Sequence, residues 1–286
     1  MMKSAVAILI SLLPAVQASA LIEVGSSIRA TDGIPAWIQS YRTTVDKMKT
    51  SNSYPADGYT ECRETEEVKS AYLCISNTQK GMNSSLGRAS FFIEGLGGAN
   101  SKGKVVSQDN GTYQMYKNMI GGHDLKGQDL LRFNDTVTKE CAASKQDANI
   151  CHNAYEKDLF ENFILPLAGQ DPKFVVITFA SQSSMQWEDV VTHEILHAQY
   201  FNDDQFRAIA DEFWEKEVSA EDKKQIISAL SQHYDPTDAL LMRNEFQAYM
   251  LMAGAEYSQL SMFVPKYRDA LMKKLVAKGI QPIQVQ

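Results

Sequence analysis

The chain has 286 residues, of which 44% are apolar, and its formal net charge is −7 at pH 7. This length favours one large domain or two small ones, and the apolar share suffices for a sizeable core. An acidic chain without a long basic run is a poor ligand for nucleic acid or for an anionic membrane surface. Composition therefore favours a globular protein and argues against both of those partner classes.

The first twenty residues have the pattern of a secretory signal peptide. Lys3 supplies a positive charge, an apolar stretch follows, and Ala18-Ser19-Ala20 fits the small-x-small pattern of a cleavage site. The apolar stretch is shorter than the ~20 residues of a transmembrane helix, so a membrane anchor is the weaker alternative. We expect residues 1–20 to be removed, which leaves a secreted or periplasmic protein without a membrane span.

Cysteine usage agrees with export. The four cysteines are Cys62, Cys74, Cys141 and Cys151, which form two close pairs in the sequence. None of the pairs has the C-x-x-C spacing of a zinc site. Local pairing, Cys62–Cys74 and Cys141–Cys151, is the simplest of three possible connectivities in an oxidising compartment.

The chain changes character near residue 170. The preceding region, 21–170, is mixed, and we expect helices at 34–48 and 151–165, strands at 72–75 and 89–94, and a loop at 95–103. The following region, 171–286, begins with a strand at 173–180 and continues mostly as helix. We therefore predict an α+β fold in which a small mixed sheet is combined with a mainly helical C-terminal half.

Capping residues divide the C-terminal half into five helices. They are expected at about 185–201, from Asp203 or Asp204 to about 218, after Ser219, from Asp235-Pro236-Thr237 to about 253, and from Pro265 to before Gly279. Ser183 or Ser184 is available to cap the first of them.

The first of these helices contains His193-Glu194-Ile195-Leu196-His197. Residues four apart share a helical face, so the imidazoles of His193 and His197 can bind one tetrahedral metal ion. Glu194 is placed to take a proton from a water whose pKa the metal lowers. The alternative is a buried helix with two hydrogen-bonded histidines. Because the chain has only five histidines, a chance H-E-x-x-H is improbable, and we expect one Zn²⁺ per chain.

Glu245 is the expected third ligand of the metal. It lies in a helical segment rich in Leu, Met, Phe and Ala, where a carboxylate is costly unless it is paired or bound to a metal. Asp203 is an alternative, six residues after His197. A chain that turns sharply there needs a Gly three residues after the histidine, but this position is Tyr200. Asp203 is also a good helix N-cap, and His233 is a third possibility.

Together with Asn244-Glu245 and Ala248, the H-E-x-x-H motif resembles the gluzincin group of zinc metallopeptidases. The 47 residues between His197 and Glu245 exceed the gap in thermolysin-like enzymes. The spacing is more similar to that in the catalytic domain of anthrax lethal factor and its relatives. The resemblance covers about residues 173–257, and it implies a zincin-like fold and a protein or peptide substrate.

The resemblance also bears on the groups around the metal. Thermolysin-like enzymes have an Asp four residues after the ligand Glu, which orients a histidine, but here that position is Tyr249. The orienting group is therefore not identified. Gluzincins generally stabilise the oxyanion with a Tyr or His, and we expect Tyr249 in this role, with Tyr234 and His233 as alternatives. A sheet edge beside the motif helix usually pairs with the substrate; the strand at 173–180 is either this edge or a buried strand.

The function indicated is hydrolysis of peptide bonds by a secreted zinc metalloendopeptidase. A zinc amidase that acts on cell-wall peptides would use the same motif. A non-catalytic zinc-binding or interaction protein on a zincin scaffold is a further alternative, but the intact Glu194 argues against it. Residues 21 to about 165 could also be a pro-region that covers the cleft.

Overall fold

The structure is a computed structural model. It describes residues 59–66, 68–95, 101–117, 120–181, 187–252 and 258–284. The expected signal peptide, the helix expected at 34–48 and the proposed caps Ser183 and Ser184 lie outside the described residues.

A four-stranded mixed sheet forms the centre of the fold, with strand order β1-β2-β4-β3. Its strands are β1 (Tyr59–Glu64), β2 (Ala71–Ser76), β3 (Gly122–Lys126) and β4 (Val175–Ala180). β2 and β4 are parallel, and β1 and β3 pair antiparallel with them on the outside. Every residue of β2 and β4 is buried, which agrees with their continuous apolar sequences.

The strand expected at 173–180 is therefore confirmed as an internal strand. It is not the edge of the sheet, because β4 has a neighbouring strand on each side. The edge that lies against the motif helix is β3, in which exposure alternates along the strand. β2, from before residue 170, pairs directly with β4, from after it, so one sheet unites the two regions.

Residues 89–94 are helical, and the strand expected there was wrong. They form the last part of α2 (Gln79–Glu94), which begins after the N-cap Thr78 and ends at Gly95 in a left-handed conformation with φ 73°. Residues 81–92 of this helix are all buried. The helix has no exposed face and buries polar residues such as Arg88 and Ser90 together with apolar ones. It therefore lacks the pattern of a surface helix, and a short stretch of it is easily mistaken for a strand.

The other elements before β4 are short helices and one long one. They are α3 (Gly111–Tyr116), α4 (Gly127–Ala143), α5 (Ala154–Leu159), a π-helical turn (Phe160–Ile164) and α6 (Leu165–Ala168). The helix expected at 151–165 begins at Ala154, because Asn153 and Glu156 form a capping box there. The described parts of the expected loop, 95 and 101–103, are not helical or extended.

All five helices expected in the C-terminal half are present. They are α7 (Trp187–Asn202), α8 (Asp204–Glu217), α9 (Ala220–Leu230), α10 (Ala239–Leu251) and α11 (Val264–Val276). The side chains of Asp203, Ser219 and Asp238 accept hydrogen bonds from the first turns of α8, α9 and α10. Within the described ranges, no helix has both the length and the apolar character needed to span a membrane.

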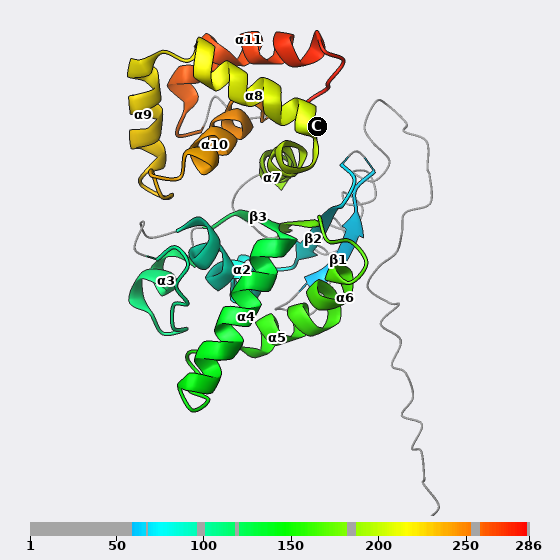
Figure 1. Cartoon of the computed structure of the whole chain (residues 1–286), viewed down its shortest axis with the longest axis vertical. Helices are drawn as coiled ribbons and strands as arrows, with labels where there is room; N and C mark the ends of the chain where they lie inside the picture. Colours follow the sequence, from blue (N-terminus) through cyan, green and yellow to red (C-terminus); the bar gives the residue numbers. More distant parts are fainter. Residues whose placement is uncertain are drawn as a thin grey trace, which may run out of the picture.

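The motif helix α7 lies between the sheet and the layer formed by α8 to α11 (Figure 1). Val191 and Ile195 pack in one apolar core with β2 and β4. Leu196 and Tyr200 pack in a second core with α8, α10 and α11. On the other side of the sheet, α2, α4 and α5 enclose a third core. The α+β class with a small mixed sheet is thus confirmed, and α7 is the buried helix that joins its two main parts.

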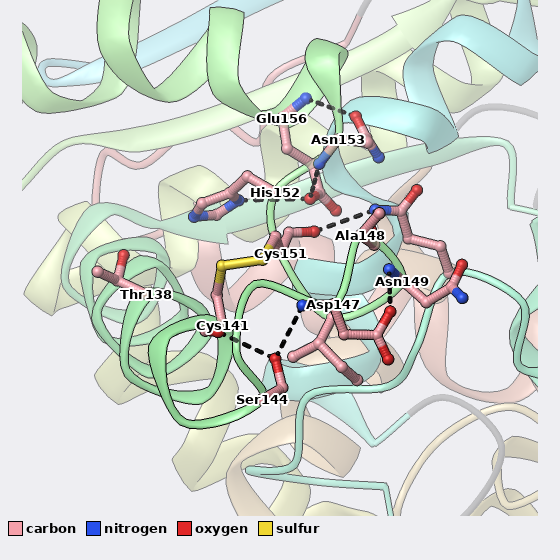
Figure 2. Close-up of a disulfide and its surroundings, with 12 residues drawn as sticks. Thr138, Cys141, Ser144, Asp147, Ala148, Asn149, Cys151, His152, Asn153 and Glu156 are labelled. Atoms are coloured by element: carbon pink, nitrogen blue, oxygen red, sulfur yellow. Dashed lines mark hydrogen bonds and ion pairs between the residues drawn. A yellow bond between two sulfur atoms is a disulfide. The ribbon is translucent and has the colours of Figure 1, made fainter.

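Both expected disulfides are formed. Cys62 and Cys74 are direct partners across β1 and β2, whereas Cys141 at the end of α4 is joined to Cys151 before α5 (Figure 2). Restricting the unfolded chain with a loop of this size contributes about 3 kcal/mol of stability per bridge.

A buried ion pair lies next to the second disulfide. Arg88 of α2 and Glu156 of α5 are both fully buried, and their charged atoms are 3.2 Å apart. Arg88 also donates hydrogen bonds to the carbonyls of Ile150 and Cys151, at 2.8 and 3.0 Å. The guanidinium therefore connects α2 to the loop that the disulfide closes.

Replacing Arg88 with Met should destabilise the fold by about 3–5 kcal/mol, because the Glu156 carboxylate would remain buried without its partner. Urea unfolding of the oxidised protein measures this loss. Arg132→Met is the matched control, since the Arg132 side chain is 58% exposed and pairs with Asp129 at 3.0 Å. Such a surface pair contributes at most about 1 kcal/mol. Equal losses in the two variants would contradict the importance of the buried pair.

Candidate metal centre

Two histidines and one glutamate from different helices meet beside the sheet. His193 and His197 come from α7 and Glu245 from α10, as the sequence predicted. The Nε2 atoms of the two histidines are 3.0 Å apart. The Glu245 carboxylate oxygens lie 3.5 Å from Nε2 of His193 and 3.7 Å from Nε2 of His197. The residues are 9%, 1% and 2% exposed, in the order of their numbers.

One hydrogen bond from α10 to α7 and one within α10 support the position of Glu245. Nε2 of Gln247 donates to the carbonyl of Leu196 at 3.3 Å and to Oδ1 of Asn244 at 3.0 Å. Both glutamine contacts are buried and lie one helical turn or less from Glu245. The carboxylate is thereby held against the histidine face of α7.

Burial keeps both histidines neutral. It lowers the pKa of His193 and of His197 to about 4, in the second case against the opposing effect of Glu245. The contacts to Glu245 at neutral pH are therefore not ion pairs. Burial also raises the pKa of Glu245, against the effect of His197 and a hydrogen bond from Tyr234. Oε2 of Glu245 is buried without a hydrogen-bond partner among the described residues.

This donor set fits a zinc ion. Two neutral imidazoles present lone pairs to the same point as a carboxylate, and two nitrogens with one oxygen is a common ligand set of catalytic zinc. The unpartnered carboxylate oxygen is costly in a buried position, and a bound cation would compensate for it. His193, His197 and Glu245 are thus able to hold the metal that the sequence predicts.

Glu194 lines the same pocket as His193 and His197. It is 7% exposed, and its pKa is raised well above the usual value by burial and by the nearby carboxylates of Glu245 and Glu94, while a hydrogen bond with Asp124 opposes the rise. Gly122 of β3 packs directly on this side chain: a Cβ atom at Gly122 would lie 2.8 Å from Cδ of Glu194. Only a glycine allows β3 to approach the carboxyl group so closely.

The expected Tyr249 also lines this pocket. Its ring centroid is 4.5 Å from that of His193, and its hydroxyl accepts a hydrogen bond from Gln259 at 3.0 Å. The alternatives Tyr234 and His233 line the same pocket, and the Tyr234 hydroxyl is hydrogen-bonded to Glu245. The structure thus brings all three candidates for the oxyanion-stabilising role to one cavity.

Asp203, the alternative third ligand, does not join this group. Its carboxylate caps α8 by accepting hydrogen bonds from the backbone of Gln205 and Phe206, at 2.9 and 3.0 Å. This is the N-cap role that the position of Asp203 before a helix also predicts.

Two carboxylates of the site were not found in the sequence, Glu94 and Asp124. Glu94 ends α2, Asp124 lies on the edge strand β3, and both line the pocket. They also line a second, adjoining pocket, whose wall carries the cations Lys102, Lys126 and Arg132. Neither acid belongs to a recognisable sequence motif. Each reaches the site through helix packing or strand pairing between segments that are far apart in the sequence.

A buried histidine fixes β3 from its other face. His123 lies between Gly122 and Asp124, and its side chain therefore points away from the site. Its Nδ1 is 2.6 Å from Oγ of Ser90, and its Nε2 is 2.8 Å from Oδ1 of Asn83, both on α2. The edge strand is thus attached to α2 by two buried hydrogen bonds.

Comparison of the chain with protein-family models, with curated proteins and with solved structures finds no match.

His193→Ala and Glu245→Ala should each lower the zinc content of the purified mature protein from about one ion per chain, because each removes one of the three candidate ligands. Elemental analysis after dialysis against zinc measures this content. Asp203→Ala should keep its zinc and lose only about 1 kcal/mol of stability as a lost N-cap. Zinc retained by Glu245→Ala and lost by Asp203→Ala would reverse the two assignments.

His123 should make the protein less stable in acid. Burial lowers the pKa of His123 to about 3 in the folded state, against about 6.5 in an unfolded chain. Only the unfolded chain binds this proton between those values, so stability is lost as the pH falls below about 6.5, by up to about 1.4 kcal/mol per pH unit. Urea unfolding of the metal-free protein from pH 7 to pH 4 should show a smaller slope for His123→Gln than for the parent. Identical slopes would show that His123 does not contribute.

Proposed function

We propose that this protein is a secreted zinc metalloendopeptidase of the gluzincin type with a zincin-like fold. His193, His197 and Glu245 are its metal ligands and Glu194 is its general base. The observation that carries the proposal is the convergence of two neutral, buried imidazoles and an unpartnered carboxylate, with the Glu194 carboxyl group in the same pocket.

The proposed reaction is hydrolysis of a peptide bond by water. A bound zinc ion supplies a Lewis acid for the substrate carbonyl and lowers the pKa of water. Glu194 accepts the proton from the attacking water and delivers it to the nitrogen of the leaving amine. Its low exposure excludes bulk water from this proton transfer, and the close packing of Gly122 restricts the carboxyl group to the pocket side.

Tyr249 is proposed to stabilise the oxyanion. Burial raises the pKa of its hydroxyl, which therefore stays protonated at neutral pH and can donate a hydrogen bond. Its hydrogen bond with Gln259 uses the tyrosine oxygen as acceptor, so the hydroxyl proton remains available. Tyr234 is hydrogen-bonded to Glu245 and is the better candidate for holding that ligand in place.

An extended peptide is the proposed substrate. β3 is an edge strand, and Gly122 at its start lines the pocket beside Glu194. Main-chain groups on a strand edge can pair with an extended peptide and bring its carbonyl to the metal site. Secretion is supported by the N-terminal signal pattern and by the two disulfides, which persist in oxidising compartments.

Glu194→Gln should retain about one zinc per chain and lose peptidase activity by about 10²–10⁴-fold, because the amide cannot accept the proton. Cleavage of an unfolded protein substrate such as reduced casein, with and without chelator, measures the activity. Glu188→Gln is the matched control, since it makes the same change six residues earlier on α7 and should be fully active. Failure of the zinc-loaded parent protein to cleave any peptide would refute the proposal. Full activity of Glu194→Gln would show that Glu194 is not the general base.

A further inference from the structure

The imidazole of His197 has two sides, and the proposed metal accounts for only one. Its Nε2 faces His193 and Glu245. Its Nδ1 is buried and has no hydrogen-bond partner among the described residues. Oδ2 of Asp124 is 3.9 Å from this Nδ1, and the Asp124 side chain is only 10% exposed. An acidic side chain therefore faces the unpartnered nitrogen of a ligand histidine.

The same carboxylate also lies beside the proposed base, Glu194. Polar atoms of Asp124, Glu194 and His197 are all within 4.8 Å of one another. One side chain of the edge strand is thus next to both a proposed metal ligand and the proposed general base, which are three residues apart on α7.

We propose that Asp124 is a positioning residue that orients the imidazole of His197 and the carboxyl group of Glu194. The inference rests on the proposed function. A carboxylate that accepts a hydrogen bond from the second nitrogen of a ligand histidine fixes the tautomer and the plane of the ring and makes it a better ligand. Thermolysin-like enzymes have an orienting Asp four residues after the ligand Glu, where this chain has Tyr249. Asp124 would take that role from β3 instead, and it would act on His197.

The rigidity of β3 makes this role possible. Asp124 is a direct partner of Ile177 on the internal strand β4. On the opposite face, His123 is held by Ser90 and Asn83. Gly122, without a side chain, lets the strand lie against Glu194. The pairing of β3 with β4, the hydrogen bonds of His123 to α2 and the contact of Gly122 with Glu194 together fix the position of β3. The Asp124 side chain therefore has little freedom to move away from α7.

Two other arrangements of these groups are less well supported. A second cation between Asp124, Glu194 and His197 would require one imidazole to bind two ions and would remove Glu194 from proton transfer. Asn244 is the other polar neighbour of His197, and its hydrogen-bonding interaction raises the pKa of that histidine. No side chain among the described residues reaches Nδ1 of His197 with hydrogen-bond geometry, however, and Oδ1 of Asn244 also accepts a hydrogen bond from Gln247 at 3.0 Å. As a neutral group, it also increases the basicity of an imidazole less than a carboxylate does.

The test compares Asp124→Asn and Asp124→Ala with two controls in the mature full-length protein. Asp129→Asn removes a carboxylate from the adjoining pocket, and Asn244→Ala removes the alternative neighbour of His197. Zinc affinity is measured by competition with a chelator, and ligand geometry by the visible absorption spectrum of the cobalt-substituted protein. Steady-state kinetics on one peptide give kcat and KM separately.

We expect Asp124→Ala to weaken zinc binding by about 10–100-fold, to change the cobalt spectrum, and to lower kcat with little change in KM. Asp124→Asn should show the same direction with a smaller effect, and it carries the test if Asp124→Ala does not fold. Asp129→Asn should match the parent in all three measurements, and Asn244→Ala should affect zinc affinity less than Asp124→Ala.

Suppose that the parent is active with one zinc ion, and that both Asp124 variants have the same zinc affinity and cobalt spectrum as the parent. That result would overturn this inference and leave the proposed function intact. A larger effect from Asn244→Ala would also overturn it. Two zinc ions in the parent, one of them lost in Asp124→Ala, would make Asp124 a ligand and not a positioning residue. A parent that binds no metal would refute both this inference and the proposed function.

Discussion

The burial of α7 between the sheet and the C-terminal helices is the constraint on which the rest of the structure depends. The helix is apolar on nearly all sides, so it contributes to two cores at once through Ile195 and Leu196. His193, Glu194 and His197 line one pocket, where α10 and β3 supply the surrounding groups. Because burial disfavours charged imidazoles, the two histidines stay neutral, and burial also disfavours the Glu245 charge opposite them. The burial of α7 thus accounts both for the packing of the two cores and for the neutral state of the two histidines.

The histidine pair and the third candidate ligand could be predicted because their signals are local. His193 and His197 are one helical turn apart, and Glu245 is conspicuous as an acid within an apolar helix. The helix caps Asp203 and Ser219 act on residues directly after them, and so the starts of α8 and α9 were placed correctly from the sequence, whereas α10 begins after Asp238 and not directly after Asp235-Pro236-Thr237.

The parts that escaped prediction depend on contacts between distant segments. Residues 122–126, Gly-His-Asp-Leu-Lys, contain one large apolar side chain, and they form a strand because β4 offers them an unpaired edge. Asp124 and Gly122 become site residues only through this pairing. The end of α2 was assigned to a strand because complete burial removes the amphipathic pattern that identifies a helix. In both cases tertiary structure determines the local conformation.

The grouping of His193, His197 and Glu245 has a thermodynamic consequence for the whole chain. These residues belong to two helices that are separated by the whole of α8 and α9, and α7 in turn packs on a sheet built from residues 59–180. An ion bound only by the folded arrangement stabilises that arrangement by mass action, by about 4 kcal/mol when its concentration is a thousand times Kd. Both disulfides lie before β4. On the proposed function, availability of the ion would therefore govern how long the helical half, which contains no cysteine, withstands unfolding and proteolysis.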